Sequence, residues 1–91
     1  KLVIISPIHY GGIISEGDVL ILSEKEPQKD SIVLLYEKIN STPERIGRIV
    51  KVEDKDKDKY KYGILLPDDL IINLPEKKLY KVIEAVLHNL E

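Results

Sequence analysis

The stretch Ser31-Ile-Val-Leu-Leu-Tyr-Glu-Lys-Ile39 decides the fold expected of this chain. Successive side chains of an extended strand point to opposite sides, and both sides of this stretch are apolar. Ile32, Leu34 and Tyr36 would share one side, and Val33, Leu35 and Ile39 the other. Because a strand of this kind is buried on both sides, we expect a second layer outside the sheet that contains it.

Five further apolar runs, rich in β-branched residues, flank this stretch and favour strands. Turn-forming residues such as Ser6-Pro7, Gly17-Asp18 and Pro67-Asp68-Asp69 separate several of them. The runs cover residues 2–5, 19–22, 45–52, 60–66 and 70–72. Together with residues 31–39, they predict six antiparallel strands.

Two details of the later strands carry expectations of their own. Gly47 within residues 45–52 predicts a β-bulge or a close approach of two backbones. Residues 53–59 alternate in charge between two strands, which is typical of a solvated hairpin tip. They lack the glycine and the spaced ligands of a calcium loop, so no metal site is expected there.

From Asn73 onward, the apolar residues change to a helical period. Asn73 and Glu76 have the spacing of a capping box, and Pro75 suits the first turn of a helix. The apolar stripe contains Leu79, Val82, Ile83, Val86, Leu87 and Leu90. The sequence therefore predicts an amphipathic helix at about residues 74–90. Docked on the outer side of residues 31–39, it would complete a mainly β fold, a small antiparallel six-stranded β-barrel with one C-terminal amphipathic α-helix.

The composition suits one domain that spans residues 1–91. Five Tyr are its only aromatic residues, and Cys is absent, which excludes disulfides and thiolate chemistry. With only His9 and His88 as imidazole groups, far apart in sequence, neither a metal nor another cofactor is expected. The chain begins at Lys1 rather than Met, which is typical of a processed or excised piece.

The balance of charge restricts the partners. Fourteen basic and sixteen acidic residues give a formal net charge of −2. A mixed, mildly acidic surface suits a soluble, cytoplasmic monomer and makes nucleic acid an unlikely partner. No apolar run approaches the roughly 20 residues that span a bilayer, so membrane insertion is not expected.

Catalysis finds little support. Ser6 lies near His9, but no Gly-x-Ser-x-Gly elbow surrounds it, and a turn serine that bonds its own backbone is the simpler interpretation. Asp68-Asp69 stands in a turn, where solvated carboxylates are common. The Gly11-Gly12 pair lacks the Lys of a phosphate-binding loop. We therefore expect a protein that binds a ligand or partner, and not an enzyme.

The first loop carries most of the candidate ligand-binding residues, which are Ser6, His9, Gly11 and Gly12. Its glycines permit positive φ, and its backbone N–H groups could face a phosphate. Arg45 and Arg48 would add charge-assisted hydrogen bonds if the fold brings them close. The alternative is that both arginines are solvated strand residues and the loop is only a turn.

Several segments resemble a PilZ domain, the small β-barrel module of bacterial cyclic di-GMP receptors. Residues 2–6 followed by Gly11-Gly12-Ile13 resemble the first-strand motif Asp/Asn-x-Ser-x-x-Gly of that family, although Ile4 stands where the family has Asp or Asn. Residues 17–22 resemble its next barrel strand. Residues 45–52 and 62–66 resemble the paired strands that precede its terminal helix.

The resemblance implies a non-catalytic binding or adaptor domain in bacterial signalling or motility. Cyclic di-GMP is the ligand that it implies, with Ser6, Gly11 and Gly12 in the site. The Arg-x-x-x-Arg motif of the family has no counterpart upstream of Leu2. Family members without it are regarded as protein-interaction modules of type IV pilus or motility systems, so a protein is the other partner expected.

Two alternatives belong to other classes. Tyr10 to Leu22, with Glu26-Pro27 after it, resembles the start of a HIRAN domain, which binds DNA ends. A basic concave patch in the folded domain would favour that alternative. The other is a structural or protein-interaction β-barrel domain of a larger protein.

Overall fold

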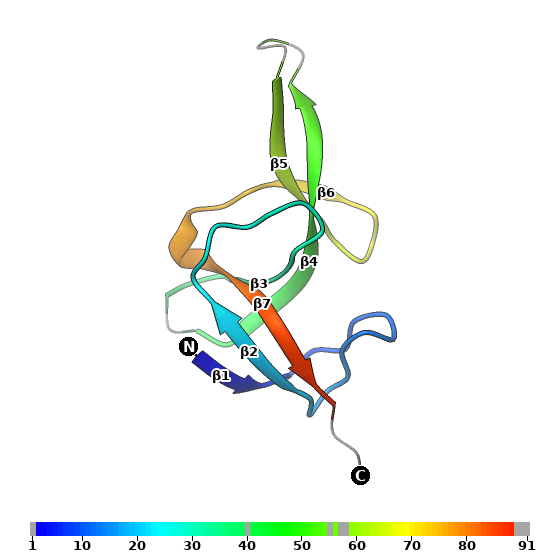
Figure 1. Cartoon of the computed structure of the whole chain (residues 1–91), viewed down its shortest axis with the longest axis vertical. Coiled ribbons are helices and arrows are strands. Elements are labelled where there is room, and N and C mark those ends of the chain that lie inside the picture. The colour runs from blue at the N-terminus through cyan, green and yellow to red at the C-terminus, as the bar shows by residue number, and fades with distance from the viewer. Residues whose placement is uncertain (1, 40, 55, 57–58, 89–91) are drawn as a thin grey trace.

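The computed structural model describes residues 2–39, 41–54, 56 and 59–88. These residues form seven β-strands and one turn of 3-10 helix, η1 (Figure 1). The strands are β1 (Leu2–Ile5), β2 (Val19–Ser23), β3 (Ile32–Tyr36), β4 (Pro43–Asp54), β5 (Lys59–Leu65), β6 (Ile71–Asn73) and β7 (Tyr80–Leu87); η1 covers Lys77–Leu79. The mainly β class expected from the β-branched runs is confirmed.

All the described strands belong to one open antiparallel sheet, in the order β1-β2-β7-β3-β4-β5-β6. The last described strand, β7, lies between β2 and β3 (Figure 1). Its Ile83 is opposite Leu22 of β2 and opposite Ile32 of β3. β4 and β5 continue beyond their neighbours as a two-stranded arm, and the molecule measures 49 × 26 × 19 Å along its principal axes.

Both sides of β3 are buried, as the sequence predicts. One side faces the cluster Val33, Leu35, Ile49, Ile64, Leu66 and Tyr80, called here the Val33 core. The other faces the cluster Ile14, Leu20, Leu22, Leu34 and Ile46, called here the Leu34 core. Each of these aliphatic side chains contributes at most about 1.5–3 kcal/mol on burial. The sheet therefore depends on apolar packing against both of its faces.

Loops provide the second layer that the sequence predicts. Ile14 of the β1–β2 loop belongs to the Leu34 core, and Ile8 and Tyr10 of the same loop pack against it. Leu66, before β6, belongs to the Val33 core, and Leu74, after β6, packs against it. Both faces of β3 are thus covered without a docked helix.

The prediction of a C-terminal helix at about residues 74–90 is wrong. Residues 77–79 form η1 and residues 80–87 form β7, while residues 89–90 lie outside the described part of the chain. Tyr80, Val82 and Ile83 are aromatic or β-branched and favour a strand. A central strand that is covered on both faces needs apolar residues on both faces. β7 is such a strand, and it has them.

A β-bulge explains why β7 has the residue spacing of a helix. The register between β2 and β7 shifts at Ile21/Leu22, where Glu84 is an extra residue in β7. Residues three apart in a regular strand point to opposite sides. The bulge brings Ile83 and Val86 to the same side, where both pack on the Leu34 core. One inserted residue thus produces the Ile83 to Val86 interval of the stripe, whereas Val82 packs on the Val33 core, on the other side of the sheet.

The prediction of a six-stranded barrel is also wrong, because the described strands form an open sheet with β1 and β6 at its edges. A barrel closes only when its edge strands pair. β1 has four residues and β6 three, and the other five strands separate them. Neither the barrel nor the terminal helix that the PilZ resemblance implies is found in the described residues.

Gly47 marks a close approach of β4 and β5, one of the two outcomes expected for it. A Cβ atom at this position would meet the side chain of Ile64 and lie 2.9 Å from the carbonyl oxygen of Leu65. The bulge of β4 lies at Glu44 instead, where the register with β3 shifts. Any side chain at position 47 would therefore push the two strands apart.

We expect Gly47→Ala to lower the free energy of unfolding by about 1–3 kcal/mol, because the added methyl group overpacks this contact. The matched control is Lys51→Ala, an exposed position on the same strand, which should change it by less than about 0.5 kcal/mol. Urea unfolding followed by far-UV circular dichroism measures both. Similar effects of the two substitutions would contradict the close approach.

Candidate functional site

The loop between β1 and β2 is held by backbone hydrogen bonds that extend the pairing of the two strands. Ser6 N donates to Asp18 O at 2.7 Å, and Gly17 N donates to Ser6 O at 2.9 Å. At the tip, Tyr10 and Ile14 form an isolated antiparallel bridge. The turn between them uses two glycines, Gly11 and Gly12, with φ of 41° and 80°. The positive φ expected of the glycine pair is confirmed.

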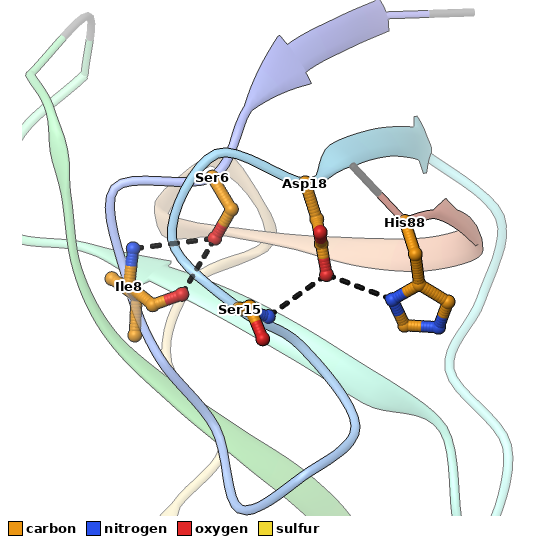
Figure 2. A network of polar contacts seen from close by, with 5 residues as sticks. All are labelled: Ser6, Ile8, Ser15, Asp18 and His88. Carbon is orange, nitrogen blue, oxygen red and sulfur yellow. Dashed lines mark hydrogen bonds and ion pairs between the residues drawn. The ribbon is translucent and has the colours of Figure 1, made fainter. Parts of the chain in front are cut away.

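The hydroxyl of Ser6 serves the turn that follows it. Ser6 Oγ donates to the carbonyl oxygen of Ile8 at 2.7 Å and accepts from Ile8 N at 3.2 Å (Figure 2). The side chain is buried, with 1% exposure. A buried hydroxyl in this position shapes the backbone and is not presented to a ligand.

A buried carboxylate, Asp18, connects the loop to the end of β7. Asp18 Oδ2 accepts from Ser15 N at 2.8 Å and lies 2.9 Å from His88 Nδ1 (Figure 2). Asp18 is 2% exposed, whereas the His88 side chain is 58% exposed. Burial of a carboxylate is costly unless hydrogen bonds or an opposite charge compensate it. Asp18 therefore ties two distant segments together.

Ser6, Asp18 and His88 are near one another, but their order does not suit nucleophilic catalysis. A catalytic imidazole lies between the serine and the carboxylate, within reach of both. Figure 2 shows Ser6 and His88 on either side of Asp18. The hydroxyl bonds the backbone of Ile8 instead of an imidazole.

The candidate ligand residues are only partly assembled. Ser6, His9, Gly11 and Gly12 share one loop, on which His9 and both glycines are exposed. The arginines do not share a face of the sheet. Arg45 is opposite Leu35, which belongs to the Val33 core, and Arg48 is opposite Ile32, which packs on the Leu34 core.

Acidic residues surround Arg45. A hollow of about 200 Å³ beside it is lined by Glu37 and Glu44. A hydrogen bond with Glu37, together with repulsion from its charge, raises the pKa of Glu44 above its usual range. Two carboxylates this close make the hollow unfavourable for an anion.

One of the concave surfaces lies along β1, and we call it the β1 groove. It has a volume of about 460 Å³ and runs between β1 and the connection from β3 to β4, next to η1. Its apolar lining includes Leu2, Ile4, Ile5, Tyr36 and Ile39. This size and character are typical of a site that binds part of another molecule.

Large apolar side chains are exposed along the same strand. Leu2 is 47%, Val3 58% and Ile5 63% exposed, and Ile39 across the groove is 56% exposed. β1 pairs with β2 on one edge only, in the part of the chain that the structure describes. An exposed apolar edge strand is a surface on which other chains can pair.

The charged groups that line the β1 groove are lysines. Lys78 and Lys81 are among its lining residues, and no acid is among those described. Their ion pairs are with exposed carboxylates, Glu76 for Lys78 and Glu24 for Lys81, each at 3.2 Å. Burial raises the pKa of the Tyr36 phenol above its usual value, so this phenol stays uncharged at neutral pH.

Two other kinds of feature are absent from the described residues. No group of three or more His, Cys, Asp or Glu side chains there could hold a metal ion. None of the helical structure described is long and apolar enough to cross a membrane.

Comparisons with known proteins give no match: no family model, no curated protein and no solved structure is similar to the chain.

We expect Asp18→Ala to lower the free energy of unfolding by about 1–3 kcal/mol, because Ser15 N and His88 lose a buried acceptor. Asp68→Ala is the control: Asp68 is exposed and accepts a long hydrogen bond of 3.3 Å from Leu70 N. It should cost less than about 0.5 kcal/mol. Urea unfolding of both variants measures the difference, and an Asp18→Ala effect as small as that of the control would contradict the structural role of Asp18.

Proposed function

We propose that this chain is a non-catalytic adaptor domain that binds a protein partner at the β1 groove. The observation that supports it most directly is the apolar edge of β1, whose Val3 and Ile5 are more than half exposed beside a groove of about 460 Å³. Folded domains rarely leave an apolar strand edge open unless another chain covers it.

The loop chemistry supports binding over catalysis. The Ser6 hydroxyl bonds the Ile8 backbone, and His88 contacts Asp18 rather than Ser6. His9, the imidazole close to Ser6 in sequence, is exposed on the loop. A nucleophile without a base in reach has no means of activation.

Nucleic acid is a weaker candidate. Lys78 and Lys81 line the β1 groove, and Lys25 and Lys77 line a neighbouring hollow that Lys78 and Lys81 also border. Each of the four has an acidic partner within 4 Å, and these partners are Glu76, Glu24, Glu84 and Glu26 in the same order. Four lysines with acidic neighbours, on a chain of formal net charge −2, do not make the extended basic surface that a phosphate backbone requires. The HIRAN-like alternative therefore has little support.

Photocrosslinking in the cells that produce the protein tests the proposal. Benzoylphenylalanine replaces Ile5 or Ile39 on the groove, or Tyr60, which is 71% exposed on β5, as the control. We expect the two groove positions to give adducts with the same protein, and the control to give none. Adducts at Tyr60 alone, or at no position, would contradict binding at the β1 groove.

Cyclic di-GMP remains a prediction of the PilZ resemblance, and the adaptor proposal gives it no role. Its two phosphates need cationic partners, whereas Arg45 stands beside Glu37 and Glu44 and faces away from Arg48. We expect isothermal titration calorimetry to give no saturable heat with cyclic di-GMP, as with GTP as the control. Saturable heat with the dinucleotide alone would restore the receptor hypothesis.

A further inference from the structure

We propose that the occupant of the β1 groove is an extended, acidic and apolar segment of a partner protein, which adds to the sheet as a strand beside β1. This inference rests on the proposed function, and it specifies how the partner binds and which chemistry it carries.

The outer edge of β1 has backbone groups that can pair with an added strand. Its inner edge pairs with β2 in regular register, from Leu2 opposite Leu22 to Ile5 opposite Val19. Every second residue of an edge strand directs its N–H and C=O groups to the open side. An extended peptide can satisfy these groups by main-chain hydrogen bonds, as in other cases of strand addition. Pro7 shortly after β1 restricts the pairing to a short segment.

The side chains along β1 favour an alternating apolar partner. Leu2 and Ile4 are on the side of the sheet that carries the Leu34 core and line the groove. Val3 is exposed on the other side. An added strand would place one half of its side chains next to Leu2 and Ile4 and the other half next to Val3. Apolar side chains at these positions would stabilise its pairing with β1. Ile39 would cover the side chain that enters the groove.

The lysines define the charge of the partner. Lys78 and Lys81 line the groove together with apolar residues and no described acid. The carboxylates that they contact now, Glu76 and Glu24, are 69% and 83% exposed. Exposed pairs of this kind contribute little free energy, so an acidic residue of the partner can replace them.

A second copy of this chain fits the groove less well. Pairing of β1 with β1 of another copy would bring the Lys78 and Lys81 side chains of both copies to one interface. Like charges brought together across an interface oppose association. Charge therefore favours a different, acidic chain.

The test uses a fluorescently labelled synthetic peptide of alternating Glu and Val, with its binding to the full chain followed by fluorescence polarisation. One control peptide carries Lys in place of Glu. A second keeps the acidic sequence but has N-methyl groups on alternate backbone amides, which removes the donors of one edge. We expect saturable binding of the first peptide, and binding weaker by at least about fivefold for each control.

Variants of the chain identify the site. Lys78→Glu and Lys81→Glu should each weaken binding of the acidic peptide by about fivefold or more, whereas Lys61→Glu on β5, away from the groove, should leave it unchanged. Val3→Asp, which places a charge on the exposed edge strand, should abolish binding. Circular dichroism of each variant checks that the fold is retained.

Each other result overturns the inference in a distinct way. Equal binding of all three peptides would refute the inference that the partner is an acidic strand. The crosslinking experiment would then decide by itself whether a protein binds at the β1 groove. No binding of any peptide, with adducts still formed at Ile5 and Ile39, would refute strand addition alone. A dimer in analytical ultracentrifugation that Val3→Asp dissociates would identify a second copy as the occupant.

Discussion

The insertion of β7 between β2 and β3 is the constraint on which the rest of the structure depends. In the strand order, β1 and β2 form one antiparallel piece and β3 to β6 another, and among the described strands only β7 pairs with both pieces. Ile83 contributes to both junctions, opposite Leu22 and opposite Ile32. Since β7 is the last described strand, the sheet is complete only when residues 80–87 are in place.

This arrangement also creates the candidate site. β7 positions β2, β2 carries β1 on its outer edge, and β1 then lies across from the connection between β3 and β4 without pairing with it. The gap is the β1 groove, which a closed barrel would not contain. The contact between Asp18 and His88 holds the β1–β2 loop to the end of β7. The same strand thus supports the loop, the edge and the groove.

Much of the fold could be predicted, because strand runs and turn glycines are local signals. The burial of both sides of β3, with Val33 on one side and Leu34 on the other, followed from side-chain alternation. The helix prediction failed because a bulge at Glu84 gives Ile83 and Val86 a helical interval. The contact of Asp18 with His88 joins residues that no sequence spacing relates, although an Asp directly after a turn glycine was a weak signal. The groove was missed because the expected barrel would have paired the outer edge of β1.

Nuclear Overhauser effects between β7 and its neighbours test the central claim most directly. The account predicts interstrand contacts of Ile83 with both Leu22 and Ile32, and extended backbone shifts through residues 80–87. Contacts between residues three apart within 80–87, with helical shifts and without contacts to β2 and β3, would contradict it. In that case the sheet would divide into two pieces, and the β1 groove would lose the strand that positions it.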